Sequence, residues 1–221
     1  MKRLSKIKIK WSSKFAYAMG LLATDGNLSK DERHIDFTSK DKELVSKFRE
    51  CLGIDNKIGI KYRGRDDYQR KQYFRVQVGD INFYQFLLSI GLSPKKSKTL
   101  DSLDIPEEFS SDFLRGCIDG DGSIGSFKHP ESKYPQLRVR LVSASRNFLE
   151  WIKLRIESTT KIKGGWICKS KDIFLLSYGK SDSTKLLRFL YKDKDCICLT
   201  RKFEIAKSLM GEWRNWDTRG A

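Results

Sequence analysis

An internal repeat constrains the fold of this chain most strongly, because two segments with the same residue pattern fold as two related units. Residues 17–27 and 113–123 share a glycine inside an apolar run, followed by an Asp-Gly pair. The matching pairs are Gly20 with Gly116, Asp25 with Asp121 and Gly26 with Gly122. The repeat therefore predicts two copies of one supersecondary unit.

The similarity continues downstream of this first match, in the same order. Phe37-Thr38-Ser39 matches Leu141-Val142-Ser143, and residues 75–79 match residues 175–179. The spacing between the copies drifts by a few residues, as loop insertions would produce. We therefore expect one repeat in residues 1–103 and a second in residues 104–221. Residues 94–109, polar and proline-containing, read as the connection between them.

Hydrophobic periodicity predicts an α+β fold with roughly α-β-β-α-β-β-α in each half, one strand being left unplaced. The expected helices are 15–23, 42–52, 82–90, 109–118, 147–158, 183–191 and 200–210. The expected strands are 34–39, 58–63 and 73–79 in the first half and 136–143, 163–170 and 172–179 in the second. Both apolar motif helices are predicted to be buried, most simply against each other.

Charge gives the first indication of a partner. The chain has 44 Lys and Arg against 28 Asp and Glu, a formal net charge of +16. Both halves carry the excess, which favours a broad basic face over a basic tail. A surplus of this size indicates a polyanionic partner, usually nucleic acid. A basic enzyme unrelated to nucleic acid stays possible on charge alone.

Several classes of protein do not fit the sequence. No apolar run approaches the roughly 18 residues of a membrane span, and residues 1–11 lack the apolar core of a signal peptide. The five cysteines form no CxxC pair, and the chain has only two histidines, so a structural zinc site is not expected. We expect an intracellular protein with buried free thiols and no membrane partner.

The repeated motif suggests close packing and a charged pair. Gly20 and Gly116 lie inside helices, where glycine costs about 1 kcal/mol relative to alanine, so close approach of a second backbone is the best explanation. Gly26 and Gly122 are then expected to end these helices as left-handed caps. This geometry brings the carboxylates of the preceding aspartates together.

Paired carboxylates at helix C-termini repel each other and oppose the helix dipole. A shared divalent cation would offset both penalties, and oxygen ligands suit Mg²⁺. An Asp-Gly pair is also a common turn, and for a single copy the turn is the better interpretation. Two copies at equivalent positions favour a site formed by Asp25 and Asp121.

The motif resembles that of a known family. Residues 114–122, Leu-Arg-Gly-Cys-Ile-Asp-Gly-Asp-Gly, are similar to the signature of the LAGLIDADG homing endonucleases, and residues 18–26 form a weaker copy. Two motifs about 100 residues apart are typical of the single-chain, pseudo-dimeric members. The resemblance implies two αββαββα units packed through the motif helices, with antiparallel sheets forming a saddle on the DNA major groove.

The resemblance also implies site residues. Asp25 and Asp121 would ligate Mg²⁺ or another divalent cation such as Mn²⁺, and the carbonyls of Thr24 and Gly120 would turn toward it. Asp119 has Ala23 as its counterpart in the first repeat, so a structural or capping role is expected for it.

A basic residue is implied near each scissile phosphate. Lys96 is the first-half candidate, with Lys98 in reserve, and Lys202 is the second-half candidate. A solvated surface lysine or a plain phosphate contact is the alternative for each. Ser39 and Ser143 lie where some family members orient water, although a surface role is the simpler interpretation.

Strand alternation provides candidates for reading DNA bases. They are Lys61, Arg63, Arg75, Gln77, Arg138, Arg140 and Lys169, with Arg65 and Arg70 in an adjoining loop. Trp166 is as well suited to packing as to DNA contact. A shift of one residue would reverse each of these faces.

The function implied is site-specific double-strand DNA cleavage by a monomer on a long, imperfectly palindromic target. An RNA maturase that binds its intron and a DNA-binding regulator on the same fold are the alternatives. Retention of both acids argues for cleavage.

Overall fold

The computed structural model of this chain describes residues 5–64, 70–127, 136–193 and 195–217. Its first half contains, in order, α1 (Ser13–Asp25), β1 (Gly26–Leu28), β2 (His34–Ser39), α2 (Lys42–Cys51), β3 (Gly59–Arg63), β4 (Lys71–Gly79) and α3 (Ile81–Ser89). Its second half contains α4 (Ser110–Asp121), β5 (Gly122–Phe127), β6 (Gln136–Ser143), α5 (Arg146–Thr160), β7 (Trp166–Ser170), β8 (Ile173–Tyr178), α6 (Lys180–Leu190) and α7 (Thr200–Asp217). Arg65 lies outside the described residues.

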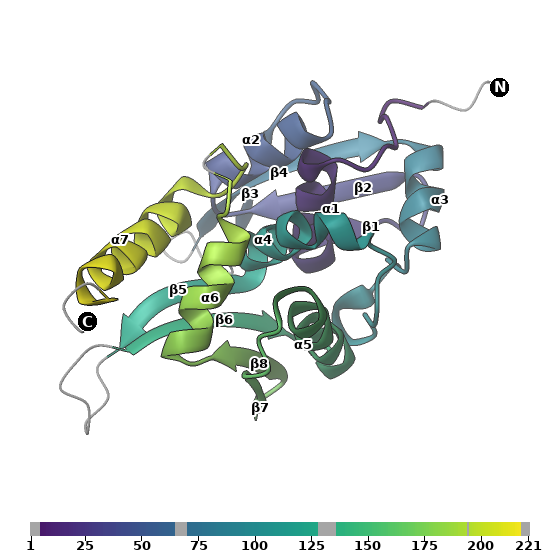
Figure 1. The fold of residues 1–221 in the computed structure, drawn as a ribbon. Helices are drawn as coiled ribbons and strands as arrows, with labels where there is room; N and C mark the ends of the chain where they lie inside the picture. Colours follow the sequence, from purple (N-terminus) through teal and green to yellow (C-terminus); the bar gives the residue numbers. More distant parts are fainter. Residues whose placement is uncertain (1–4, 65–69, 128–135, 194, 218–221) are drawn as a thin grey trace.

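The strands form two antiparallel sheets of four, with the orders β1-β2-β4-β3 and β5-β6-β8-β7. The predicted α+β class and the two related halves are confirmed. Short 3₁₀ turns at Lys96–Lys98 and Glu107–Phe109 lie in the connection between the halves. Figure 1 shows α1 and α4 in the middle of the molecule, with one sheet on either side of them.

The strand register confirms the alignment of the repeats. Phe37 pairs with Gly26 in the first sheet, and Leu141 pairs with Gly122 in the second. On the next strand, Phe37 pairs with Val76 and Leu141 pairs with Leu176. Each predicted match therefore occupies equivalent positions in the two sheets.

The strand that periodicity left unplaced is β1 in the first half and β5 in the second. Each begins at the glycine that ends the motif helix, and that glycine is not the left-handed cap we expected. Gly26 has φ −77° and ψ 151°, and Gly122 has φ −95° and ψ 168°, both extended. Glycine is needed for space instead, because a Cβ would lie 2.6 Å from Leu22 O or Ile118 O.

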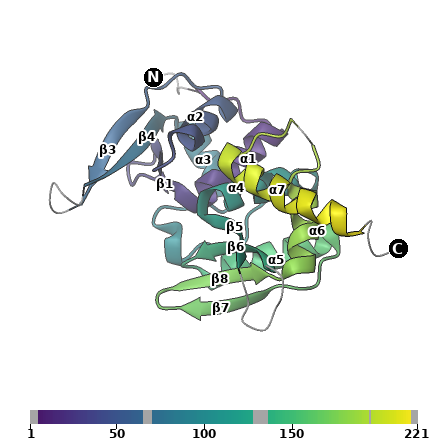
Figure 2. The ribbon, with the colours of Figure 1, turned by 90° about the vertical axis from the view of Figure 1, so that its left-hand side faces the viewer.

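The motif helices pack backbone against backbone. A Cβ on Gly20 would lie 2.2 Å from Phe113 O, and one on Gly116 would lie 2.2 Å from Tyr17 O. Residues 15–23 of α1 and 110–119 of α4 are buried on all sides. Figure 2, turned from the first view, again shows the two helices side by side between the sheets. This close contact sets the distance between the two helix C-termini.

Helices cover one face of each sheet. Val76 and Val78 of β4, and Val139 and Leu176 of the second sheet, point into this covered face. Apart from the buried Ser177, the opposite face of each sheet carries half-buried and exposed residues on its paired strands, and we call it the open face. The open faces adjoin the ends of α1 and α4, because β1 and β5 continue directly from them.

Two further expectations are answered here. All five cysteines lie in the described part of the chain and are free thiols, but only Cys117 and Cys198 are buried, and Cys168 is exposed. Within the described residues, none of the helices combines the length and the apolar character that crossing a membrane requires.

Candidate functional site

The C-termini of α1 and α4 bring Asp25 and Asp121 to one place. A Cβ on Gly120 would lie 2.1 Å from Thr24 Oγ1 and 3.5 Å from Asp25 Oδ2. Only glycine at position 120 therefore allows the helix ends to approach this closely. Asp25 is half-buried and Asp121 is exposed, so both residues are accessible to solvent.

The pKa of both carboxyl groups is raised. Burial and, second to it, the negative charge of Asp121 raise the pKa of the Asp25 carboxyl to about 6, against the opposing effect of Lys96 and Lys202. The pKa of Asp121 is raised too, mainly because the neighbouring helix ends exclude water from part of its carboxyl group, although the residue as a whole is exposed. Without a cation, ionisation of Asp25 and Asp121 therefore costs more free energy in the folded protein than in water.

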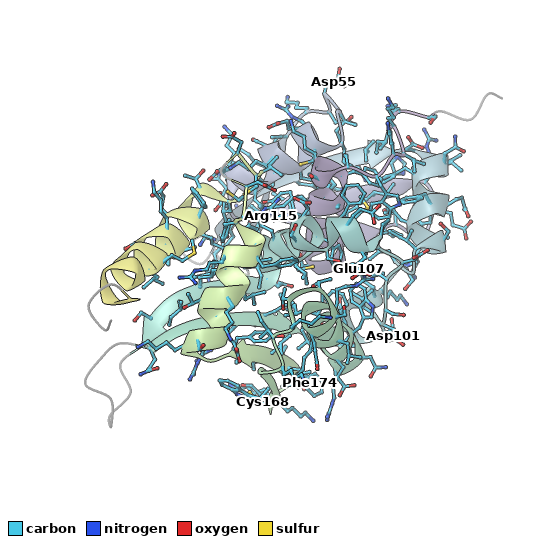
Figure 3. The ribbon with its side chains drawn as sticks, viewed as in Figure 1. Asp55, Asp101, Glu107, Arg115, Cys168 and Phe174 are labelled. Carbon is cyan, nitrogen blue, oxygen red and sulfur yellow. The ribbon has the colours of Figure 1, made fainter. Side chains whose placement is uncertain are left out.

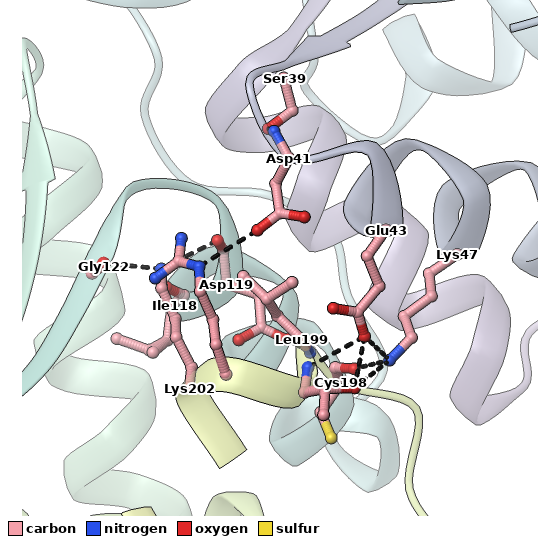
Figure 4. A network of polar contacts seen from close by, with 12 residues as sticks. Ser39, Asp41, Glu43, Lys47, Ile118, Asp119, Gly122, Cys198, Leu199 and Lys202 are labelled. Atoms are coloured by element: carbon pink, nitrogen blue, oxygen red, sulfur yellow. Dashed lines mark hydrogen bonds and ion pairs between the residues drawn. The ribbon is translucent and has the colours of Figure 1, made fainter. Parts of the chain in front are cut away.

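Lys96 and Lys202 are buried beneath the two carboxylates. The Lys96 ammonium donates hydrogen bonds to Thr24 O at 3.3 Å and Gly26 O at 2.8 Å. The Lys202 ammonium donates to Ile118 O at 2.6 Å, Asp119 O at 2.9 Å and Gly122 O at 2.7 Å, as Figure 4 shows. Each lysine thus caps the C-terminus of the motif helix in its own half.

Burial lowers the pKa of both lysines to about 8, while the nearby aspartates act in the opposite direction. The positive charges lie where helix dipoles are negative, which is a favourable placement. An ammonium group has three donors, and Lys202 uses all three on carbonyl groups. As placed here, Lys202 acts on its surroundings through its charge. The reserve candidate Lys98 is exposed.

Asp119 is fully buried and joins three elements. Its Oδ2 accepts hydrogen bonds from Tyr17 Oη and from Leu199 N, both at 2.7 Å. It therefore links α1 to the start of α7, the helix that carries Lys202. This contact agrees with the structural role expected for Asp119.

A second set of contacts, around the segment that leads into α7, had no signal in the sequence. Glu43 Oε1 of α2 accepts from Thr200 N at 3.0 Å, and Lys47 donates to the Cys198 carbonyl. Arg115, which lies near the centre of the molecule in Figure 3, donates to Ile197 O at 2.8 Å. These contacts fix the first turn of α7 against both repeats.

The residues present suit a divalent cation. Among the described residues no cluster of three or more His, Cys, Asp and Glu side chains occurs, so a cation would have two carboxylates as its charged ligands. Mg²⁺ commonly binds through one or two carboxylates, with water and substrate phosphates completing its shell. The Thr24 carbonyl oxygen accepts a hydrogen bond from Lys96. Lys202 donates to the carbonyl oxygens of Ile118, Asp119 and Gly122 and not to that of Gly120. The predicted carbonyl ligands thus differ between the two halves.

Ser39 and Ser143 have equivalent local roles. Ser39 Oγ accepts from Asp41 N at 3.2 Å, and Ser143 Oγ accepts from Ser145 N at 3.1 Å. Each hydroxyl group thus closes the turn that leads into the following helix.

The first open face brings together four of the predicted DNA-contact residues. The register puts Lys61, Arg63, Arg75 and Gln77 on this face. Arg75 forms an ion pair with Asp36 at 2.5 Å, and the Arg63 guanidinium lies 4.9 Å from the centre of the Tyr73 ring. Arg70 is exposed just before β4.

The second open face carries Arg138 and Arg140 but not Lys169. Trp166 pairs with Ser177, which also pairs with Arg140, so Trp166 shares the face of the arginines. Lys169 pairs with Phe174 and therefore lies on the covered side, exposed at the edge of the sheet. The prediction for Lys169 was wrong by one residue of register. The Arg138 guanidinium lies 5.4 Å from the centre of the Trp166 ring.

Comparison with known proteins agrees with this architecture. Residues 12–91 match the family model of the LAGLIDADG-like domain. An uncharacterized protein of Methanocaldococcus jannaschii is 25% identical over 155 residues, which cover 68% of this chain and 56% of that protein. The match thus spans just over half of the curated relative.

Three solved structures share the fold. The homing endonuclease I-WcaI bound to its DNA recognition sequence has a TM-score of 0.62 at 11% identity, covering 90% of this chain and 88% of that one. Full-length DUF199/WhiA from Thermatoga maritima has a TM-score of 0.56 at 14% identity, covering 93% and 63%. A variant of I-DmoI in complex with its target DNA in the presence of Mg has a TM-score of 0.53 at 15% identity, covering 82% and 97%.

These likenesses establish the fold of the chain. The chain has the LAGLIDADG fold, and its resemblance to the LAGLIDADG family is confirmed, with a LAGLIDADG-like domain in its first half. At such low identities the solved structures show the fold alone. The activity has to be argued from the site.

The raised pKa of Asp25 predicts how stability depends on pH without metal. Its folded pKa is about 6 against an ordinary 3.8, so the folded state binds more protons between these values, and stability falls as pH rises through this window. We expect Asp25→Asn to be more stable than the wild type by about 1–2 kcal/mol at pH 7.5, with solvent screening taken into account. The difference should vanish near pH 3.5. Urea unfolding at both pH values, in EDTA, checks this.

Proposed function

We propose that this chain is a site-specific double-strand DNA endonuclease that hydrolyses phosphodiesters with a divalent cation held by Asp25 and Asp121. The observation that carries the proposal is the apposition of these carboxylates over two buried lysines, between two basic open faces. A protein that only binds DNA gains nothing from two repelling acids beside a polyanion. Neighbours with this fold include endonucleases solved with target DNA and with Mg.

The open faces of the two sheets would bind the DNA duplex. The open faces, with Arg75, Gln77, Arg138 and Arg140, would bind the major groove and fix the register of the duplex. This would bring scissile phosphates to the ends of α1 and α4, where Asp25 and Asp121 lie. A bound Mg²⁺ or Mn²⁺ supplies Lewis-acid stabilisation of the negative charge that develops on the phosphoryl oxygens.

Asp25 and Asp121 would hold the cation, with the carbonyls of Thr24 and Gly120 as further ligands. Lys96 and Lys202 would place a positive charge behind each acid. Such preorganised charges stabilise a transition state that is more negative than the bound DNA. Their hydrogen bonds to the helix ends favour this electrostatic role over direct proton transfer by Lys202.

Two other functions use the same fold, namely an RNA maturase bound to its intron and a DNA-binding regulator. DUF199/WhiA shares the fold with the homing endonucleases, so the fold is common to several functions. The paired acids favour cleavage, because both alternatives function without a cation between two carboxylates. Binding alone does not separate the three functions.

Selection by cleavage tests the proposal. A randomised duplex library ligated into plasmids is incubated with the protein and Mg²⁺, and new ends are captured and sequenced. We expect ends at one defined sequence, with a constant offset between the two strands and no ends in EDTA. Duplexes that are retained by the protein but stay intact in Mg²⁺ and Mn²⁺ would favour a regulator. Retention of structured RNA in preference to duplex DNA would favour a maturase.

We expect the chain to act as a monomer on a target without perfect two-fold symmetry. The motivation is that equivalent positions of the open faces differ: Asp36 corresponds to Arg140, and Arg75 to Leu175. Multi-angle light scattering of the DNA complex should give one chain per duplex. Two chains on one site, or a palindromic selected sequence, would contradict this expectation.

A further inference from the structure

The open faces of the two sheets differ in the character of one row of residues that runs across the strands. In the second sheet this row is Val142 of β6, Leu175 of β8 and Cys168 of β7. Leu175 pairs with Val142 on one side and with Cys168 on the other. All three side chains are apolar or weakly polar. Cys168 is exposed, and the other two are half-buried.

The equivalent row of the first sheet is Thr38, Arg75 and Gly59. Its chemistry is different, since it centres on the Arg75 guanidinium, which pairs with Asp36. The same sheet position is therefore charged in one half and apolar in the other. This contrast exists although both faces lie next to one of the paired acids.

The apolar row of Val142, Leu175 and Cys168 continues to its neighbours. Ile173, next to Leu175 on the same face, is 38% exposed, and Trp166 is 44% exposed. Figure 3 labels Cys168 near the edge of the second sheet, with Phe174 beside it on the next strand. Val142 follows Leu141 on β6, and Leu141 pairs with Gly122, the residue directly after Asp121. Because the two strands are antiparallel, Val142 lies on the side of this pair where Asp121 is. The row thus leads from the paired acids outward across the sheet.

Basic residues lie beside this row. Arg140 is two residues before Val142 on β6 and shares its face, as does Arg138 beyond it. An apolar strip next to arginines matches a major groove, where thymine presents a C5-methyl group between phosphate-lined edges. An apolar protein partner would place apolar groups against the positive charge of Arg140, whereas DNA offers phosphates and base acceptors there.

We propose that the second repeat recognises thymine methyl groups through the row of Val142, Leu175 and Cys168, so that the two half-sites of the target are read by different chemistry. The occupant of this row is a thymine-containing stretch of duplex DNA, flanked by guanine that Arg140 reads. The first repeat reads its half-site through Arg75 and Gln77 by hydrogen bonds. This inference rests on the DNA-binding part of the proposed function and does not require cleavage.

Replacement of thymine by uracil tests the proposal, because it removes the methyl group and leaves base pairing intact. Duplexes that bind the protein are first selected in Ca²⁺ from a random library, so that cutting is not needed. Deoxyuridine is then placed in one half-site at a time. We expect each contacted methyl group to contribute about fourfold in affinity, the value for one buried carbon, and only in the half-site bound by the second repeat.

Protein variants identify the residues. The double variant Val142→Ser and Leu175→Ser should lose most of the discrimination between thymine and uracil duplexes, while Cys168→Ser, at an exposed position, should reduce the discrimination partly. Lys169→Ala is the matched control, because it lies next to Cys168 on the same strand but on the covered side. It should discriminate as the wild type does. Thermal melting of each variant reports any loss of folding, and the uracil duplexes test the wild-type protein without any mutation.

Several results would overturn the inference. They are equal uracil penalties in both half-sites, no penalty in either, discrimination by the double variant that equals that of the wild type, selection of no duplex at all, or dimerisation through this face in light scattering. Failure of the protein to cleave DNA would not contradict the inference about thymine recognition, because all of these measurements are made in Ca²⁺. A protein that discriminates uracil but never cuts would contradict the proposed endonuclease alone.

Discussion

Replacing Asp25 or Asp121 with asparagine should reduce Mg²⁺-dependent cleavage by roughly a hundredfold or more, the effect of removing a major electrostatic stabiliser. Asparagine keeps the size and hydrogen-bonding capacity of the side chain and removes the charge that would hold the cation. DNA binding should persist or tighten, because a negative charge beside phosphates is lost. Single-turnover cleavage in Mg²⁺ and affinity in Ca²⁺ are measured on the same preparations.

The fold offers a matched control for this experiment. Asp36→Asn also removes one carboxylate from the central region, but Asp36 pairs with Arg75 on the open face and not with a second acid. It should alter sequence preference and leave the maximal rate within severalfold of the wild type. Near-normal cleavage by Asp25→Asn or Asp121→Asn would contradict the assignment, as would a loss of activity that only follows a loss of folding.

Substituting alanine for Gly116 or Gly20 should destabilise the protein by about 3 kcal/mol or more, enough to unfold a marginally stable chain. The new Cβ would lie 2.2 Å from a backbone carbonyl oxygen of the partner helix in either case. A backbone carbonyl group cannot relieve the steric clash by changing rotamer, so α1 and α4 have to separate. This cost exceeds the gain of about 1 kcal/mol in helix propensity.

Gly125→Ala is the control for these substitutions, because a Cβ at Gly125 meets nothing within 4 Å. Its melting temperature should stay within a few degrees of the wild type, whereas Gly20→Ala and Gly116→Ala should show large decreases. If either motif variant melts as the wild type does, the helices do not depend on backbone contact at this point. Separation of the helix ends should also weaken any cation binding between Asp25 and Asp121.

The sequence predicted the central features because they depend on spacing. A glycine and an Asp-Gly pair at matching positions are sufficient to predict helix contact and paired acids. The offsets between the repeats equally predicted which strand residues are equivalent, and the register of Phe37 and Leu141 confirms them. Alternation predicted the faces of long, half-buried strands such as β6, where Leu137 and Val139 are buried.

Other features depend on contacts that periodicity does not encode. The short edge strand β7 is exposed or half-buried along its whole length, so its pattern could not fix a face, and Lys169 was assigned to the wrong one. The caps at Gly26 and Gly122 were predicted from glycine's freedom at positive φ, whereas crowding by the preceding helical turn decides these positions. The bond between Glu43 and Thr200 joins residues 157 positions apart and follows only from packing.

The central claim is that Asp25 and Asp121 together hold a divalent cation against bound DNA. Crystals of the complex with selected DNA, soaked in Mn²⁺, allow the cation to be located directly by anomalous diffraction. We expect an anomalous peak within coordination distance of both carboxylates and of a phosphate oxygen, and no such peak for the doubly substituted Asp25→Asn, Asp121→Asn protein. Ordered DNA on both open faces with no peak between the two aspartates would contradict the account.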